Sequence, residues 1–401
     1  MLTLRELPPT AGMPLLWHDF LPATSKPDLE TMLSQFLGVP FVQVECSGTA
    51  CLVIALELLK QLSPRRTVLI PAYTCPLVPL AVAHAGLQVR LCDTRPDSFD
   101  MDLDCLRRQC DDSILCVVPT HLGGLVSDLE PVVQMARQAG AYVIEDAAQA
   151  LGATWRGKTV GTVGDIGFYS LARGKGLTVY EGGILVAQNA QLRSGLREIS
   201  QGIAGSRPGI ELLRLIQLVG YCLLYNPTAL SLAYGAPLRY WLSKGDPVRA
   251  VGDDFSEDIP LHKMSSLRKL VAASALKRLP ETLAGNVERG QRRAADLNSI
   301  PGLKVIADSP DGRGTWPFLT VLCDTAEARD LALAELWSKG LGVSRLFIHD
   351  LAGYPFLARV VPSVPMPNAR SLSARTLTIS NSAWLTDSDF SRIRDTLAAS
   401  M

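Results

Sequence analysis

A lysine flanked by glycines and an aspartate at the end of an apolar run are the residues best suited to covalent chemistry in this chain. Lys175 stands between Gly174 and Gly176, which add no side-chain bulk. Its amine could form a Schiff base with a carbonyl compound, although a solvated loop lysine would give the same local pattern. Asp146 follows the apolar run 142–144, and α/β sheets usually bind ligands at the ends of such strands.

This pair of residues indicates a particular cofactor. An enzyme that uses pyridoxal phosphate needs a lysine for the cofactor aldehyde and an acid that faces the pyridinium nitrogen. The acid keeps that nitrogen protonated, so the ring can withdraw electrons from the substrate carbon. Lys175 and Asp146 would supply these two groups.

A glycine between hydroxyl residues marks a candidate anion site. The sequence Ser47-Gly48-Thr49-Ala50 directly precedes the long apolar segment 51–62. The start of a helix presents free backbone N–H groups and the positive end of the helix dipole to an anion. The same residues could equally form no more than an ordinary helix cap.

Several motifs that occur in order resemble the DegT-type sugar aminotransferases, a family also named with DnrJ and StrS. The motifs are EDAAQA at 145–150, GDIGFYS at 164–170, and the spacing from Ser170 to Lys175 followed by EGG at 181–183. The likeness covers most of residues 37–397. It implies the α/β fold of aspartate aminotransferase, which is fold type I of the pyridoxal phosphate enzymes. Such a chain has a large domain with a mostly parallel, seven-stranded-type sheet and a small α+β C-terminal domain that closes over the site.

The resemblance also implies roles for individual residues. Lys175 and Asp146 would be the catalytic pair, and both would contact the cofactor. The other residues that it assigns to the cofactor are Gly48, Thr49, Ala50 and Ser170 at the phosphate and Gln149 near the ring hydroxyl. The residues that correspond to substrate-facing positions of relatives are His121, Arg345 and His349. A loop or surface role is open for each of these last three.

Two positions depart from the family pattern. The aromatic residue that stacks on the pyridine ring in relatives falls on Cys75, so Tyr73, two residues earlier, is the candidate for that role. Relatives also have an asparagine before a Met-Ser pair, and that asparagine reaches the phosphate of the neighbouring subunit. Here Leu261, His262 and Lys263 precede the Met-Ser pair, and His262 or Lys263 could offer a donor or a charge instead.

The order of composition changes predicts four parts of the chain. An irregular N-terminal arm covers 1–27, and a large cofactor-binding domain covers 28–255, with an apolar insertion at 211–242. A connecting helix lies within 256–300, and the small domain covers 301–401.

Within these parts, the pattern predicts individual elements. A helix with apolar residues at helical spacing begins at Ser25 or Asp28. The segments 67–94 and 113–149 each show the strand, helix, strand order of a doubly wound sheet. One long helix is expected from Ser265 to about Asn298.

The insertion is the least familiar part of the sequence. Residues 215–238 contain no charged side chain and are bracketed by Arg214 and Arg239. That length meets the threshold for a membrane-spanning helix, but Asn226-Pro227 breaks it near the middle, which favours two short helices. Three interpretations stay open: a hairpin packed on the partner subunit or on its own core, a patch that dips into one membrane face, and a true span.

Composition limits the classes of partner and cofactor. Lysine plus arginine equals aspartate plus glutamate at 39 each, which gives no indication of a nucleic acid partner. The nine cysteines are scattered, and the first residues lack the pattern of a secretory signal. We therefore expect reduced thiols in a cytoplasmic protein. No Cys-x-x-Cys pair or histidine cluster has metal-ligand spacing, so we expect no metal site.

These features predict a homodimeric, pyridoxal phosphate-dependent aminotransferase of sugar biosynthesis. It would move an amino group from glutamate or glutamine to a keto group, for which the resemblance implies a nucleotide-linked sugar. One alternative is another reaction of this cofactor on a non-sugar or lipid-linked substrate. Another is a catalytically silent family member that acts as a scaffold or regulator. The homodimer is implied by the resemblance, and a peripheral membrane contact through 215–238 is a further alternative.

Overall fold

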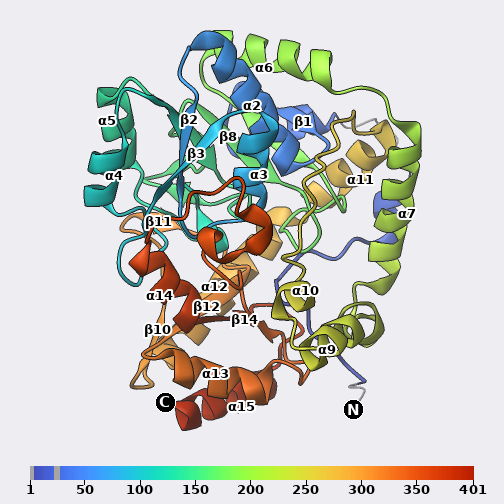
Figure 1. Ribbon diagram of the computed structural model, residues 1–401. Coiled ribbons are helices and arrows are strands. Elements are labelled where there is room, and N and C mark those ends of the chain that lie inside the picture. Colours follow the sequence, from blue (N-terminus) through green and yellow to red (C-terminus); the bar gives the residue numbers. More distant parts are fainter. Residues whose placement is uncertain (1–3, 22–27) are drawn as a thin grey trace.

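The computed structural model describes residues 4–21 and 28–401 (Figure 1), and its largest sheet has seven strands. Their order across the sheet is β1 (Gln43–Glu45), β9 (Gly183–Val186), β8 (Ile166–Ser170), β5 (Tyr142–Asp146), β4 (Ile114–Val117), β2 (Thr67–Pro71) and β3 (Gln88–Cys92). The strands from β8 to β3 are parallel, whereas β9 pairs antiparallel with β8 and β1. This arrangement confirms the predicted α/β fold with a mostly parallel sheet.

Helices cover both faces of this sheet, which explains why its central strands read as continuous apolar runs. The helices nearest to it are α2 (Gly48–Leu62), α3 (Leu77–His84), α4 (Leu103–Gln109) and α5 (Glu130–Gln138). Alternate residues of β2 serve opposite faces: Val68 and Ile70 join the core formed with α2 and α3, and Leu69 joins the core formed with α4 and α5. The two predicted strand, helix, strand segments are thus confirmed.

The predicted N-terminal helix is present as α1 (Leu29–Leu37). The Asp28 side chain caps it by accepting a hydrogen bond from the Thr31 N–H at 3.1 Å. Ser25, the other candidate for its start, lies outside the described residues. The helix ends at Gly38, whose φ of 64° suits a glycine.

A second sheet of four antiparallel strands lies towards the C-terminus. Its order is β10 (Leu303–Val305), β12 (Phe318–Cys323), β14 (Thr376–Ser380) and β13 (Val343–Ser344). The helices that accompany it are α13 (Ala326–Leu336), α14 (Pro367–Arg375) and α15 (Asp387–Ser400). A small third sheet joins this part to the loop after β5, since β11 (Gly312–Arg313) pairs with β6 (Thr154–Trp155), and β6 pairs with β7 (Lys158–Thr159).

The single long helix that we expected from Ser265 to Asn298 is two helices. α11 (Ser266–Leu276) ends before Lys277, and α12 (Leu279–Asn298) begins two residues later. Pro280 stands in the first turn of α12, where it needs no hydrogen-bond partner. In a continuous helix, Pro280 could not donate to the Leu276 carbonyl, and its ring would clash with that carbonyl, so α11 ends at Leu276.

The apolar insertion forms a chain of helices outside the main sheet. It follows α6 (Ala190–Ile203) and consists of α7 (Pro208–Leu224), α8 (Pro227–Leu230), a π-helical turn (Ser231–Gly235), α9 (Ala236–Ser243) and α10 (Pro247–Val251). The predicted break is confirmed, because Asn226 caps α8 by accepting from the Ala229 N–H at 3.1 Å, and the helical pieces on its two sides meet at 112°. In Figure 1, α7 runs along the right side of the molecule.

One side of the insertion packs inward and the other faces outward. Leu218, Tyr221 and Leu238 are buried. Among the large apolar side chains that stay exposed are Leu212, Leu213, Ile216, Leu223, Leu224, Leu232 and Tyr240. Among the described residues, no single helix is long and apolar enough to span a membrane, and only the bent pieces Pro208–Leu224 and Pro227–Ser243 together meet that test of length and composition.

The N-terminal arm, residues 4–21, connects the parts of the fold. The Thr10 hydroxyl donates to the Gly174 carbonyl at 2.8 Å, and the Tyr225 hydroxyl donates to the Thr10 carbonyl at 3.2 Å. The Ala11 N–H donates to the Pro317 carbonyl at 2.7 Å. The arm therefore contacts the Lys175 loop, the insertion and the C-terminal part.

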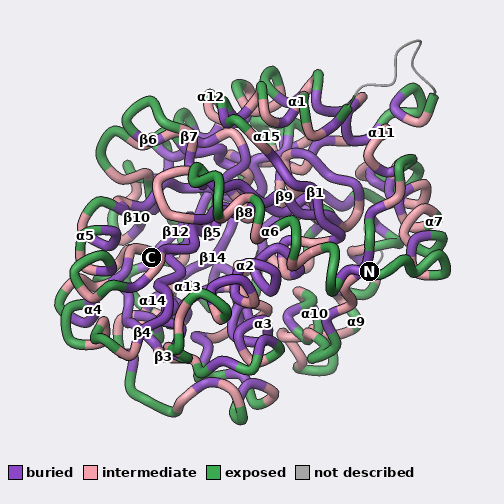
Figure 2. The backbone as a smooth tube through the Cα atoms, turned by 90° about the horizontal axis from the view of Figure 1, so that it is seen from above, coloured by how far each residue is buried: buried purple, intermediate pink, exposed green. Residues whose placement is uncertain are grey.

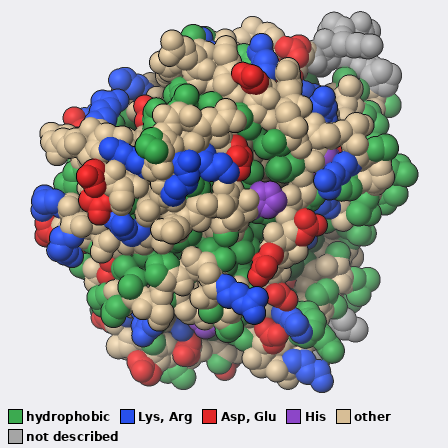
Figure 3. Space-filling view, turned by 45° about the horizontal axis from the view of Figure 1, so that its top comes forward, with side chains coloured by type: hydrophobic (Ala, Val, Ile, Leu, Met, Phe, Trp, Pro, Cys, Tyr) green, Lys and Arg blue, Asp and Glu red, His purple; other side chains and the backbone are tan. Residues whose placement is uncertain are grey.

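Burial and charge are distributed as expected for a water-facing surface. Figure 2 shows the strands of the main sheet in the buried interior, while the outer sides of the helices are exposed. Figure 3 shows positive and negative side chains interspersed over one face of the molecule.

Candidate active site

A cavity of 370 Å³ lies where several parallel strands end. Asp146 is the last residue of β5, His121 follows β4, and Cys75 follows β2. The start of α2 and the Lys175 loop complete the lining. The predicted site residues that the cavity brings together are Gly48, Thr49, His121, Asp146, Gln149, Ser170 and Lys175.

Burial sets the charge balance of the lysine and the aspartate. Asp146 is only 3% exposed, and its Oδ1 accepts from the Ala148 N–H at 3.0 Å. Burial raises the pKa of Asp146 to about 6, and the Ala148 N–H and the charge of Lys175 partly oppose that shift. Burial also lowers the pKa of the Lys175 amine below its usual value. A larger fraction of the amine is therefore in the neutral, nucleophilic form.

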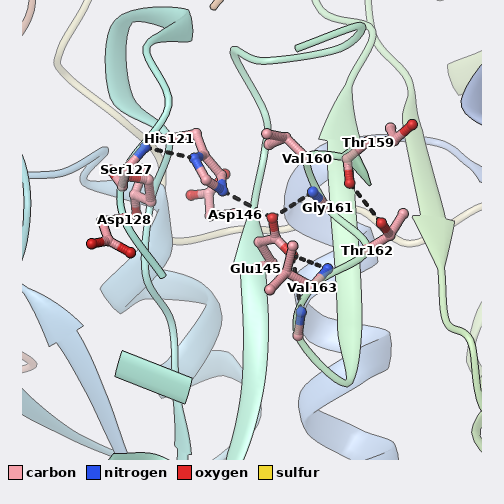
Figure 4. Close-up of polar contacts among 12 residues, drawn as sticks. His121, Ser127, Asp128, Glu145, Asp146, Thr159, Val160, Gly161, Thr162 and Val163 are labelled. Atoms are coloured by element: carbon pink, nitrogen blue, oxygen red, sulfur yellow. Dashed lines mark hydrogen bonds and ion pairs between the residues drawn. The ribbon is translucent and has the colours of Figure 1, made fainter. Parts of the chain in front are cut away.

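The neighbour of Asp146 has a supporting role (Figure 4). Glu145 Oε1 lies 2.9 Å from His121 Nε2 and accepts from the Gly161 N–H, while Oε2 accepts from the N–H groups of Val163 and Gly164. Burial works to raise the pKa of Glu145, but the hydrogen bonds from His121 and the backbone lower it overall. Glu145 thus fixes His121 and a loop beside β8.

The orientation of His121 follows from both of its ring nitrogens. Nδ1 accepts from the Ser127 N–H at 3.1 Å, so the ring proton belongs on Nε2, which donates to Glu145. Because both nitrogens are engaged inside the protein, His121 presents its ring, and no free nitrogen, to the cavity.

The start of α2 forms the candidate phosphate cradle. The Ser47 hydroxyl accepts from the Ala50 N–H at 3.0 Å, so Ala50 has already used its donor, and it does not line the cavity. The N–H groups of Gly48 and Thr49 have no hydrogen-bond acceptor within residues 4–21 and 28–401. A Cβ at Gly48 would lie 3.2 Å from the Ser170 Cβ, so a larger residue there would push the helix start and Ser170 apart by a few tenths of an ångström.

Gln149 is held at the opposite side of the cavity. Its Oε1 accepts from the Gly123 N–H at 2.6 Å, and its backbone carbonyl accepts from the Thr315 hydroxyl at 3.1 Å. Gly123 has a φ of 70°, which favours glycine at this turn. The loop after His121 and the C-terminal part therefore both fix this glutamine.

Tyr73 requires a correction, because its position does not fit the stacking role that we gave it. Its ring is fully buried, lies parallel to Phe99 at 6.0 Å, and does not line the cavity. Its hydroxyl donates to the Phe347 carbonyl at 3.3 Å. Cys75 lines the cavity instead, and burial raises the pKa of its thiol to about 12, so it stays protonated.

Arg345 and His349 also lie outside the cavity lining. An Arg345 guanidinium nitrogen donates to the carbonyls of Ile348 and Ser373 at 2.6 and 2.7 Å, which ties two loops together. His349 packs edge-on against Tyr354, with 5.2 Å between ring centres. Because neither side chain lines the cavity, their positions in the structure do not support direct contact with the substrate.

The residues proposed to replace the family asparagine lie in a different setting. His262 is fully buried, and its Nε2 lies 2.9 Å from Glu211 Oε1. Glu211 also accepts from the Ser265 N–H and from Arg268, so this cluster joins α7 to the start of α11. Lys263 is exposed, and neither His262 nor Lys263 lines the cavity.

The structure adds residues that the sequence did not indicate. Asp253 and Phe255, which follow α10, line the cavity together with Phe347 from the C-terminal part. No local motif could have marked Asp253 or Phe255, because they lie where the family resemblance is interrupted. Glu181 also lines the cavity, and the EGG motif was its only signal.

Comparison with known proteins assigns the chain to a family. The sequence model of the DegT/DnrJ/EryC1/StrS aminotransferase family matches residues 23–209 and 260–398. The GDP-perosamine synthase of Caulobacter vibrioides is 30% identical over 181 residues, which are 45% of this chain and 48% of that protein. In this and other such matches, the chain spans about half the length of the curated relatives or less.

Longer matches are more distant in sequence. The dTDP-4-dehydro-2,3,6-trideoxy-D-glucose 4-aminotransferase of Saccharopolyspora spinosa is 23% identical over 373 residues, which are 91% of this chain and 86% of that protein. The solved structure of Helicobacter pylori PseC, an aminotransferase involved in the biosynthesis of pseudoaminic acid, superposes with a TM-score of 0.77 at 14% identity and covers 99% of both chains. That likeness shows a shared fold. The chain belongs to the DegT/DnrJ/EryC1/StrS aminotransferase family.

Proposed function

We propose that this protein is a pyridoxal phosphate-dependent aminotransferase that transfers the amino group of glutamate or glutamine to the keto group of a nucleotide-linked sugar. The observation that carries the proposal is the single cavity lined by Lys175, Asp146 and the start of α2. Membership of the aminotransferase family supports the reaction, and the substrates in the names of relatives support the acceptor.

The residues present fit this cofactor. Gly48 and Thr49 offer unused N–H groups at a helix start, where a phosphate would bind beside Ser170. Asp146 would face the pyridinium nitrogen, and that positive charge would favour the carboxylate form which burial now disfavours. Gln149 would lie at the ring hydroxyl, and Lys175 would bind the aldehyde. The cofactor, when bound, supplies a ring that withdraws electrons from the substrate carbon.

Lys175 has a second role in this proposal. When it is not bound to the cofactor, its amine would act as a base that moves a proton at the substrate carbon. Burial lowers its pKa, so more of the amine is neutral and able to accept that proton.

The test is the visible absorbance spectrum of the purified protein with added pyridoxal phosphate. Wild-type protein is expected to show a band from lysine-bound cofactor, and glutamate or glutamine is expected to bleach it. Lys175→Ala protein is expected to lack that band. A band that neither amino donor changes would favour a different reaction of this cofactor, and no band in wild-type protein would favour a silent scaffold.

We also propose that the enzyme is a cytoplasmic homodimer that contacts a membrane surface through the outer side of the insertion. The homodimer rests on the family resemblance. The membrane contact is supported by the uncharged stretch 215–238 and by the exposed apolar side chains of α7, the π-helical turn and α9. A lipid-linked acceptor is the second candidate substrate, because the segment that directly follows the insertion lines the cavity at Asp253 and Phe255.

A further inference from the structure

The segment that follows α10 closes one side of the cavity with a carboxylate. Asp253 lines the cavity and is 4% exposed. Phe255 lies beside it in the lining. Both residues fall within 210–259, the stretch that the family's sequence model leaves unmatched. The family model therefore gives no expectation for the residues of this wall.

Among the described residues, hydrogen-bond donors reach one carboxylate oxygen of Asp253. Oδ2 accepts from the Tyr354 hydroxyl at 2.7 Å and from the Ile348 N–H at 2.9 Å. These bonds hold the segment against the C-terminal part of the chain. Throughout the part of the chain that the structure describes, no donor reaches Oδ1. Oδ1 is not among the buried side-chain atoms that lack a partner, and Asp253 lines the cavity, so this oxygen is accessible as an acceptor for a ligand there.

The arginine whose charge acts on Asp253 is already committed elsewhere. Arg345 is the cation whose charge acts on Asp253, but the described contacts of its guanidinium are to the carbonyls of Ile348 and Ser373. The charge of Asp146 acts on Lys175, which also lines the cavity. A ligand hydroxyl at Oδ1 would be bound by a charge-assisted hydrogen bond.

We propose that Oδ1 of Asp253 accepts a hydrogen bond from a ring hydroxyl of the acceptor sugar, and that this contact selects hydroxylated over deoxygenated acceptors. The proposal rests on the proposed function for the keto-sugar acceptor. It makes Asp253 a specificity residue of the acceptor half of the reaction. The amino donor, which needs no ring hydroxyl, does not depend on it.

Isothermal titration calorimetry on cofactor-loaded protein without an amino donor tests this contact, because binding is then measured without turnover. The two probes are dTDP-4-dehydro-2,3,6-trideoxy-D-glucose and the dTDP-4-dehydro-6-deoxyglucose that keeps the 2- and 3-hydroxyls. The variants are D253N, its exposed neighbour D254N as the matched control, and Y354F, which removes a bond to Oδ2 and leaves Oδ1 in place. In D253N the amide oxygen can still accept from Tyr354 and Ile348.

Wild-type and D254N proteins are expected to bind the hydroxylated sugar about 10- to 100-fold more tightly than the trideoxy sugar, as loss of a hydrogen bond to a charged group implies. D253N is expected to reduce that ratio to within a few-fold of one, and Y354F to keep most of it. The proposal is overturned if wild-type protein shows no preference for the hydroxylated sugar or if D253N keeps that preference. It is also overturned if D253N weakens the binding of both sugars by the same factor. Bleaching of the cofactor band by glutamate is a separate measurement, so its failure would count against the proposed function and not against this contact.

Discussion

The individual residue that most controls this site is Asp146, because its charge state depends on what occupies the cavity. Without a bound cation, burial disfavours its carboxylate, and the pKa rises to about 6. A protonated pyridine nitrogen would supply the missing positive charge and favour ionisation again. Cofactor affinity and the ionisation of Asp146 are therefore linked.

This linkage predicts a pH dependence that Asp146→Asn removes. As the pH falls from 7 to 5, the Asp146 carboxyl becomes protonated in the cofactor-free protein and must lose that proton before it can pair with the pyridinium. We expect the ratio of the cofactor dissociation constants, Asp146→Asn over wild type, to fall roughly tenfold over this range. Fluorescence titration with pyridoxal phosphate at each pH measures both constants, and the common titration of the cofactor cancels in the ratio. A ratio that stays constant would contradict the proposed pairing.

Residues in short local motifs were predictable, whereas residues that depend on distant packing were not. Lys175, Asp146 and Gly48 could be identified because glycines, strand ends and helix starts leave marks in sequence. The sequence could not show which of Tyr73 and Cys75 lines the cavity. Phe99 and Phe347, which pack against Tyr73, come from distant segments. Asp253 was missed because its role exists only where Tyr354 and the cavity meet.

Among the elements, the insertion of α7 to α10 does two things at once. Its inner side supplies Leu218 and Tyr221 to the core, and its last residues line the cavity. Glu211 fixes α7 to Arg268 of α11 through a bond of 2.6 Å. Its outer side leaves several large apolar side chains exposed, among them Leu212, Leu213, Ile216, Leu223 and Leu224, and such a concentration of exposed apolar residues marks an interaction surface more often than a surface that contacts only water.

We expect this outer side to bind membranes. Wild-type protein should sediment with liposomes of phosphatidylcholine and phosphatidylglycerol, and the double variant Ile216→Glu/Leu223→Glu should lose about tenfold or more in partitioning, since each leucine-sized side chain contributes up to about 1.5–3 kcal/mol when buried. Leu331→Glu on α13 is the matched control, because Leu331 is also 61% exposed. If all three proteins sediment with liposomes equally, or if wild-type protein does not sediment with them, the membrane contact is contradicted. A protein interface would then explain these exposed side chains.

The sequence predicted the break of the insertion but not its path. Asn226 and Pro227 are strong local signals for a helix end and a new start, and the structure has both. The return of the chain to the cavity depends on the bonds of Asp253 to Tyr354 and Ile348, which no local pattern could show. The split of the connecting helix, in contrast, has a local signal in Pro280.

At the scale of the whole molecule, the reactive loop sits at a junction of three parts. The arm binds Gly174 through Thr10, the insertion binds the arm through Tyr225, and the C-terminal part binds the arm through Pro317. The two sheets could be predicted from the order of strands and helices. Their meeting around Lys175 could not, because the arm that joins them carries no periodic pattern.

The central claim is that Lys175 holds the cofactor, and reductive trapping tests it most directly. Borohydride treatment of protein loaded with pyridoxal phosphate makes the lysine bond permanent, and mass spectrometry of the digested protein locates it. We predict one modified peptide, with the cofactor on Lys175, and no such peptide after addition of glutamate or from Lys175→Ala protein. A cofactor found on another lysine, or no modification of wild-type protein, would contradict the account.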